Sequence, residues 1–176
     1  MLRAVLIGPP GSGKSSVGRE LANRLHCDFF DSDSEIVTRV GKPISEIFLD
    51  DGEAKFRALE KQIVAELIQK SDGVLSLGGG SILDSDTQSL VRSARTSGVA
   101  IVYLHILLTT AVPRVGLNKD RPMLLLNPRQ QWNSLMESRR PIYEELASLS
   151  YSTDDAKAED VASLIMNDLL NKTDLE

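Results

Sequence analysis

Short, continuous apolar runs recur along the chain, and several of them are bounded by glycine or aspartate. Runs of this kind are typical of strands in a parallel sheet, because helices cover both faces of such a sheet and bury its strands completely. The pattern predicts five strands, at Leu2–Ile7, Asp28–Asp31, Val74–Leu77, Val99–Leu104 and Leu149–Ser152.

Segments with helical spacing separate these runs. In the longest, apolar residues recur every three or four positions from about Gly52 to Lys70, which indicates one buried helix face. Pro43 suits the first turn of a shorter helix, and Asp84 suits the cap of another. Further helices are predicted at 16–25, 86–95, 109–115, 129–149 and 159–171. The alternation of strands and helices predicts an α/β fold, a doubly wound sandwich.

Composition narrows the function more than the fold. A chain of 176 residues suits one domain, and a net charge of −5 argues against a general nucleic-acid or membrane surface, which would need a basic excess. A single cysteine, Cys27, excludes an internal disulfide, and two histidines cannot form a His/Cys metal cluster. The N-terminal apolar run is short and has no cleavage site, and no run reaches transmembrane length. We therefore expect a cytoplasmic monomer.

The segment from Gly8 to Ser15, GPPGSGKS, fits the phosphate-loop pattern G-x-x-x-x-G-K-[ST]. It lies between a predicted strand and a predicted helix, a context that an ordinary glycine-rich turn does not need. Glycines let backbone N–H groups converge on an anion, and the helix N-terminus adds partial positive charge. Lys14 can reach the β- and γ-phosphates of a nucleotide, and the Ser15 hydroxyl can bind Mg²⁺.

Two other strand ends should meet at the same edge of the sheet, where ligands of open α/β sheets bind. Asp31 and Asp33 follow the second strand. One carboxylate could reach the metal through water and the other the acceptor hydroxyl, but Asp33 could instead cap the next helix. Gly78–Gly80 follow the third strand. They could approach an oxygenated ligand closely or form a flexible turn, although a simple turn does not need three glycines.

Several arginines indicate that the phosphoryl acceptor is itself an anion. Arg57 and Glu60 are spaced for an ion pair on one helix face. Arg139 precedes Pro141, which should kink or end a helix. Segment 116–124 lacks periodicity and carries two cations, so it is either a functional lid or a plain surface loop. Because arginine suits a carboxylate in bidentate fashion, the sequence favours a small-molecule kinase with an acidic acceptor.

Taken together, these motifs resemble the shikimate kinase family. The matching segments are GPPGSGKS, DSD (Asp31–Asp33), GExxFRxxE (Gly52–Glu60), SLGGG (Ser76–Gly80), RP (Arg121–Pro122) and RRPIY (Arg139–Tyr143). The resemblance implies a three-layer sandwich with a five-stranded parallel sheet, of the P-loop kinase type. It also implies transfer of the γ-phosphoryl group of ATP to the 3-hydroxyl of shikimate, giving shikimate 3-phosphate and ADP in chorismate and aromatic amino-acid biosynthesis.

The resemblance also assigns the nucleotide side of the site. The residues expected to hold ATP are Gly11, Ser12, Gly13, Lys14, Ser15, Ser16, Arg114 and Arg121. Ser15 and Asp31 would serve one Mg²⁺ ion per ATP. Arg114 would lie near adenine, and Arg121 would close with a lid loop at about 113–125. The loop at 153–158 is acidic and lacks the arginine and proline common in the family, so the residues that grip adenine there stay open.

On the acceptor side, the resemblance assigns a helical segment at about 33–61 within a single kinase domain, 1–176. The residues expected to bind shikimate are Asp33, Phe48, Phe56, Arg57, Glu60, Gly78, Gly79, Gly80 and Arg139. Arg57 and Arg139 would hold the carboxylate, with Arg139 preferred to Arg140 by its spacing to the following proline. Asp33, Lys14 and Arg121 would be the catalytic residues.

Two alternatives remain open from the sequence. A kinase for another polyol acid, such as gluconate, would use the same fold, although SLGGG and GExxFRxxE favour shikimate. The second alternative is a nucleotide-dependent switch module, since Asn118–Arg121 superficially resembles the guanine-reading motif N-K-x-D. In that segment the aspartate stands one place too early, and no D-x-x-G follows the third strand.

Overall fold

The computed structural model describes residues 2–116 and 128–173. Its centre is a five-stranded parallel sheet with the strand order β2-β3-β1-β4-β5. The strands are β1 (Leu2–Ile7), β2 (Asp28–Asp31), β3 (Gly73–Ser76), β4 (Ala100–His105) and β5 (Leu149–Ser152). The central strand, β1, pairs with β3 and β4, so that Val5 lies between Leu75 and Ile101.

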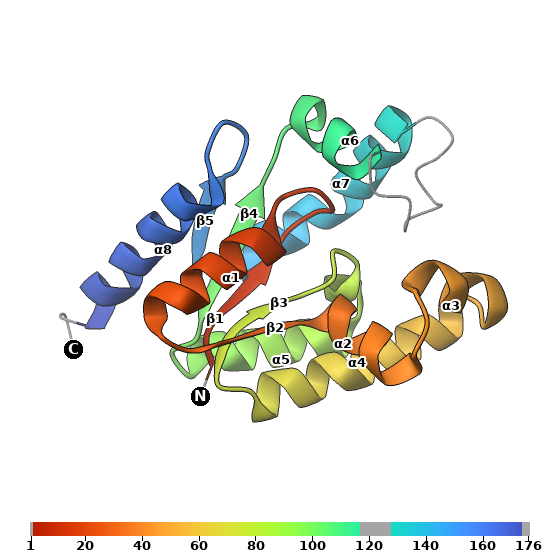
Figure 1. The fold of residues 1–176 in the computed structure, drawn as a ribbon, viewed down its shortest axis with the longest axis horizontal. Coiled ribbons are helices and arrows are strands. Elements are labelled where there is room, and N and C mark those ends of the chain that lie inside the picture. Colours follow the sequence, from red (N-terminus) through yellow and green to blue (C-terminus); the bar gives the residue numbers. More distant parts are fainter. Residues whose placement is uncertain (1, 117–127, 174–176) are drawn as a thin grey trace.

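Helices cover both faces of this sheet (Figure 1). They are α1 (Lys14–Leu25), α2 (Ser32–Val40), α3 (Ile44–Asp50), α4 (Glu53–Lys70), α5 (Ser85–Thr96), α6 (Leu108–Gly116), α7 (Pro128–Leu146) and α8 (Ala158–Thr173), with a 3-10 turn, η1 (Ser81–Leu83). As predicted, Asp84 caps α5, accepting from the N–H groups of Asp86 and Thr87.

The alternating side chains of β1 build two separate cores. Ala4 and Leu6 pack toward α1 and α8, while Val5 and Ile7 pack toward the opposite helix layer. This two-sided burial explains why the strands read as continuous apolar runs rather than as an alternation. The predicted three-layer sandwich with a five-stranded parallel sheet is confirmed.

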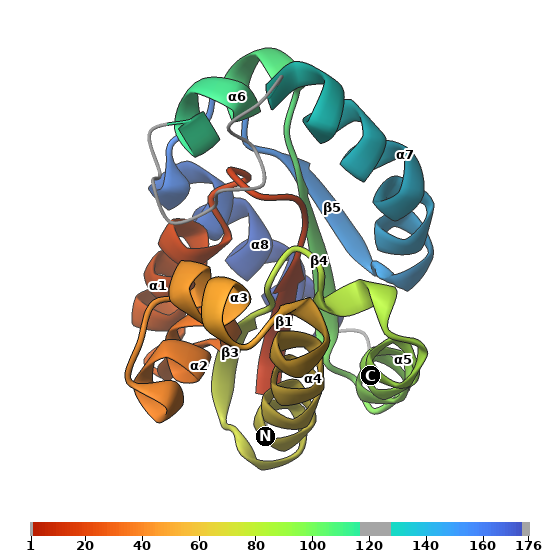
Figure 2. The same cartoon turned by 90° about the vertical axis from the view of Figure 1, so that its right-hand side faces the viewer.

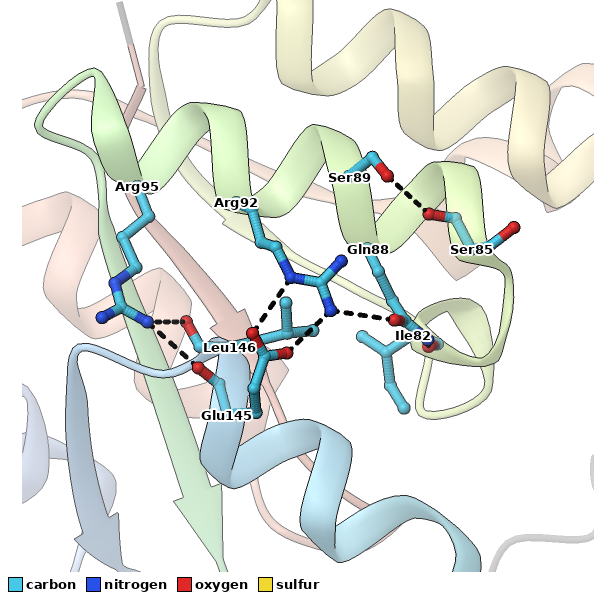
Figure 3. Close-up of polar contacts among 8 residues, drawn as sticks. All are labelled: Ile82, Ser85, Gln88, Ser89, Arg92, Arg95, Glu145 and Leu146. Carbon is cyan, nitrogen blue, oxygen red and sulfur yellow. Dashed lines mark hydrogen bonds and ion pairs between the residues drawn. The ribbon is translucent and has the colours of Figure 1, made fainter.

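The late helix predicted at 129–149 is α7, which spans Pro128–Leu146. It runs through Pro141, so of the two effects expected of this proline, ending the helix is wrong. The C-terminal end of α7 is instead held by α5 (Figure 3). Arg95 donates from Nη1 to the carbonyl oxygens of Glu145 and Leu146 at 3.0 and 3.4 Å, and Arg92 forms a two-pronged ion pair with the Glu145 carboxylate. The bonds from Arg95 serve carbonyls at the end of the helix, where the last carbonyls have no partner within it.

The loop between β1 and α1 lies between α6 on one side and α3 on the other, in both views of the molecule (Figures 1 and 2). Parallel strands β1, β2 and β3 all deliver their carboxyl ends to this region. The residues that follow those strand ends are the ones in which the sequence predicts chemistry, so the topology gathers them at one edge.

Candidate active site

A cleft of about 850 Å³ opens beside the loop that follows β1. It is lined by Gly11, Gly13, Lys14, Ser15 and Ser16 from the loop and the start of α1, and by Asp31, Asp33 and Arg114 from elsewhere. Gly13 precedes α1 in the left-handed conformation, with φ of 78°, which glycine adopts readily. Lys14 donates from Nζ to the carbonyl oxygens of Gly8 and Pro9 at 2.9 and 3.0 Å.

Asp31 links the phosphate loop to the second strand. Its Oδ2 accepts a hydrogen bond from the Ser15 hydroxyl at 2.6 Å, and its Oδ1 accepts from the backbone N–H groups of Asp33 and Ser34 at 3.1 Å. A hydroxyl and a carboxylate oxygen held together in the cleft are the hard oxygen ligands that Mg²⁺ prefers. These two residues therefore fit the magnesium site that the resemblance implies.

The cap of α2 is Asp31, so the alternative in which Asp33 caps that helix is wrong. β2 ends at Asp31, whose backbone is extended with φ of −131°, as an N-cap requires. Asp33 is already inside α2, and its side chain lines the cleft. The spacing of the two aspartates thus gives one carboxylate to the helix cap and to Ser15, and the other to the cleft.

Close packing explains the glycines after β3. A Cβ on Gly78 would lie 2.5 Å from Asp33 Oδ1 and 2.9 Å from Glu60 Oε1, and one on Gly80 would lie 2.6 Å from Arg57 Nη1. The backbone of Gly80, with φ of −103°, would suit any residue, so space rather than conformation selects glycine there. The turn at Gly78–Gly80 therefore brings α2 and α4 side chains together.

The predicted ion pair on α4 is confirmed. Arg57 donates from Nη1 to Glu60 Oε2 at 2.6 Å, and Glu60 is 4% exposed. Its other oxygen accepts from the Ser81 hydroxyl at 2.8 Å, so the carboxylate that orients Arg57 is itself held in place. Next to this group the rings of Phe48 and Phe56 lie 4.6 Å apart, and the Arg57 guanidinium lies 5.2 Å from the Phe56 ring centre.

Helix α7 also contacts this turn. Arg139 donates from Nη1 to the carbonyl oxygen of Gly79 at 3.0 Å, and the Tyr143 hydroxyl donates to that oxygen at 2.6 Å. Arg139 is 8% exposed, whereas Arg140 is exposed, which supports the choice of Arg139. Ser81 and Tyr143 were not expected in the site, because each acts through a partner distant in sequence.

Arg114, on α6, connects the phosphate loop to the loop after β5. Its guanidinium donates to the carbonyl oxygens of Gly11, Thr153 and Asp154 at 3.4, 3.1 and 3.4 Å. It thus lies between the loop expected to hold phosphates and the loop expected to hold adenine. Arg121 and positions 117–125 of the expected lid lie outside the described residues.

No helix within 2–116 or 128–173 has the length and apolar character needed to cross a bilayer. Over the same ranges, no three or more His, Cys, Asp or Glu side chains gather as a metal-binding group.

The fold and the cleft define a class: a P-loop phosphotransferase with a second binding region facing its phosphate loop. Comparison with known proteins narrows the class to one family. The family model for shikimate kinase matches residues 10–170, and the chain belongs to the shikimate kinase family. It is an ATP-dependent phosphotransferase with an alcohol group as acceptor, and ATP is its co-substrate.

Relatives and solved structures agree with this assignment. A shikimate kinase from Streptomyces avermitilis is 47% identical over 167 residues, which cover 95% of each chain. The structure of shikimate kinase from Acinetobacter baumannii in complex with shikimate has a TM-score of 0.90 at 33% identity and covers 98% of this chain and 95% of that one. The enzyme from Aquifex aeolicus has a TM-score of 0.82 at 32% identity, covering 98% of both chains.

The alternative of a gluconate-type kinase is not favoured. A gluconokinase from Sinorhizobium meliloti has a TM-score of 0.52 at 21% identity, covering 96% of both chains, which shows a shared fold alone.

Proposed function

We propose that this protein transfers the γ-phosphoryl group of ATP to the 3-hydroxyl of shikimate, forming shikimate 3-phosphate and ADP. The observation that carries the proposal is the turn at Gly78–Gly80. The Asp33 carboxylate, which lines the cleft of the phosphate loop, and the Arg57 guanidinium, which is paired with Glu60, both contact this turn. A carboxylate near the phosphates and a guanidinium beyond it suit an acceptor that is both an alcohol and an acid.

On the nucleotide side, the backbone N–H groups at the start of α1 and the Lys14 ammonium would bind the phosphates. Lys14 Nζ is held by two loop carbonyls, and it would turn from them to the more strongly negative β- and γ-phosphates. Ser15 and Asp31 would hold Mg²⁺, which when bound neutralises charge on the phosphates. Arg121 would add a guanidinium at the transferred group.

In the transfer itself, the acceptor oxygen bonds to the γ-phosphorus while the bond from that phosphorus to the bridging β–γ oxygen breaks, and ADP leaves. The hydroxyl proton passes to the Asp33 carboxylate, which lines the cleft next to Ser34 at the start of α2. Little covalent chemistry remains for the protein, so positioning of the two substrates provides most of the catalysis.

On the acceptor side, Arg57 and Arg139, which both contact the turn at Gly78–Gly80, would hold the shikimate carboxylate. Phe48 and Phe56, in contact with each other and with Arg57, would form an apolar wall for the ring. Glu60 would keep Arg57 extended toward the ligand, because its carboxylate is buried and fixed by Ser81.

We further propose a cytoplasmic monomer, a single kinase domain that binds neither nucleic acid nor membrane. Its exposed large apolar residues include Leu49 on α3, Leu83 on η1, Leu107 before α6, and Leu164 and Leu170 on α8, and its net charge is −5. Light scattering during gel filtration should give a mass near 19.3 kDa. A mass of twice that value would contradict the monomer.

The proposed reaction is tested by coupling ADP release to NADH oxidation with shikimate, with gluconate and with no acceptor. We expect turnover with shikimate only. Arg57→Ala should raise the KM for shikimate at least tenfold, because bound shikimate would bury its pair with Arg57 and the loss of one partner of a buried charge pair costs about 2–5 kcal/mol. Arg39→Ala is the matched control, since Arg39 is also a helical arginine that is paired with two glutamates and similarly exposed, but it is not among the residues expected to bind shikimate. Turnover with gluconate, or equal KM values for the two variants, would refute the assignment.

A further inference from the structure

The carbonyl oxygen of Gly79 accepts two hydrogen bonds from α7, one from the Tyr143 hydroxyl and one from Arg139. We propose that Tyr143 is a positioning residue for the acceptor: it fixes the peptide between Gly79 and Gly80 so that the Gly80 N–H faces the bound alcohol. The inference rests on the proposed function, since it assumes an acceptor held at this turn.

The direction of the Gly80 N–H follows from peptide geometry. The described chain has no cis peptide bond, and in a trans peptide the C=O and the following N–H point in opposite directions. The Gly79 carbonyl points toward α7, so the Gly80 N–H points away from α7. Arg57 lies against Gly80, and no acceptor among the described residues takes this N–H. It is therefore a donor available to a ligand beside the proposed carboxylate clamp.

A run of glycines does not hold such a peptide by itself, because glycine permits rotation that other residues resist. The turn is held at its start by the Ser32 hydroxyl, which accepts from the Gly78 N–H at 2.8 Å. It is held at Gly79 by the two donors from α7. Of these, Arg139 is also expected to engage the shikimate carboxylate, so its guanidinium would be shared between Gly79 and the ligand. Tyr143 is the anchor that binding would leave undisturbed.

Tyr143 is itself held stiffly. It has no exposed surface, and its ring stacks on Tyr103 with centres 5.1 Å apart and planes 18° apart. Just beyond it, the end of α7 is fastened to α5 by Arg92 and Arg95 (Figure 3). The hydroxyl position is thus set by packing and by α5, independently of the ligand, as a positioning group requires.

The test compares Tyr143→Phe with Tyr103→Phe. Each variant removes one hydroxyl from the same pair of stacked rings, and only the first removes a bond to Gly79. In Tyr143→Phe we expect the KM for shikimate to rise about fivefold, the value of one neutral hydrogen bond, with the KM for ATP unchanged. In the ligand-free protein, the backbone ¹⁵N resonance of Gly80 should also shift, because it reports on hydrogen bonds to the preceding carbonyl. Tyr103→Phe should change neither quantity.

Equal KM values for shikimate in the two variants, or a Gly80 resonance that stays at its wild-type position in Tyr143→Phe, would overturn the inference. Failure of the proposed function is a separate result: the wild-type protein would then release no ADP in response to shikimate. Thermal midpoints of the two variants show whether any change in KM reflects a general loss of stability.

Discussion

At the scale of single residues, position along the backbone decides what a side chain can do. Asp31 and Asp33 have the same chemistry and are two residues apart, but the strand ends at the first and the second lies inside α2. Asp31 therefore serves the helix cap and Ser15, and Asp33 faces the cleft. Substitution of Asp31 and substitution of Asp33 should therefore have different effects, and we expect the larger effect on kcat from substitution of Asp33.

Asp33→Asn should lower kcat by about 10²–10⁴-fold, because the amide keeps the size of the carboxylate but cannot accept the hydroxyl proton. Binding of ATP, measured by calorimetry, should be unchanged. Ser34→Ala, at the next position of α2 in the same cleft, is the control and should retain kcat. A kcat for Asp33→Asn within tenfold of wild type would remove Asp33 from the chemistry.

Gly80→Ala should raise the KM for shikimate without lowering stability much. Its backbone conformation suits alanine, but the new methyl group would lie 2.6 Å from Arg57 Nη1 and displace the guanidinium. Gly98→Ala gives the reverse pattern, because at Gly98 φ is 89° and a Cβ would meet nothing within 4 Å. We expect that control to lower the thermal midpoint and keep the KM. Steady-state kinetics and thermal melts of the two variants test this prediction. An unchanged KM in Gly80→Ala would contradict it and would show that the Arg57 guanidinium moves aside without loss of shikimate binding.

Sequence reasoning reached some of these residues and missed others for a physical reason. The Arg57–Glu60 pair was predictable because helical spacing alone brings the two side chains together. Tyr143 and Ser81 were not, since their bonds join residues 64 and 21 positions apart. For Gly78 and Gly80, the sequence predicted that their bare backbone could approach a ligand. It did not predict that the missing side chains also make room for Asp33 and Arg57.

At the scale of elements, the expected acceptor segment at 33–61 comprises α2, α3 and the first half of α4. The turn from α3 to α4 is tied by surface charges: Lys42 pairs with Asp50 and Asp51, and Lys55 pairs with Asp51. Hydrogen bonds from Lys42 and then Lys55 lower the pKa of Asp51 to about 2. Sequence patterns predicted these helices and a late helix that includes Pro141, whereas the bonds that join the end of α7 to α5 have no local signal.

The pH dependence of this turn follows from the lowered pKa of Asp51. Its ordinary value is 3.8, and a depressed folded-state pKa contributes stability that is complete above about pH 4 and is lost as the pH falls toward 2. Asp51→Asn should therefore lower the thermal midpoint slightly at pH 6, and the difference from wild type should shrink as the pH approaches 2. Because these groups are exposed, 1 M salt should shrink it too. A difference that is independent of pH and salt would mean that packing, not charge, holds the turn.

At the scale of the whole molecule, the strand order brings the predicted site residues together at one edge of the sheet. β1 lies between β3 and β4 while β2 lies outside β3, so the phosphate loop, the aspartates and the glycine turn follow three strands packed in the order β2-β3-β1. The alternation of elements along the sequence predicted the parallel sheet but not the strand order, which depends on which helices cross which face. The family resemblance supplied the expected roles of the site residues, but it did not predict the strand order either.

Binding of ATP at the phosphate loop should raise the thermal stability of the whole domain. A ligand that binds only the folded chain stabilises it by about 2.7 kcal/mol at 100 times its Kd, which for a protein of this size corresponds to roughly 5–10 °C in the thermal midpoint. Saturating ATP with Mg²⁺ should produce such a shift. Lys14→Met should abolish most of it, because the ammonium that neutralises the β- and γ-phosphates is gone while the loop backbone remains. Lys61→Met removes a lysine that is paired with Asp84 and Asp86 away from the cleft, and it should keep the full shift. If both variants retained the shift, the phosphates would have to be held without Lys14, and the phosphate loop would lose its place in the site.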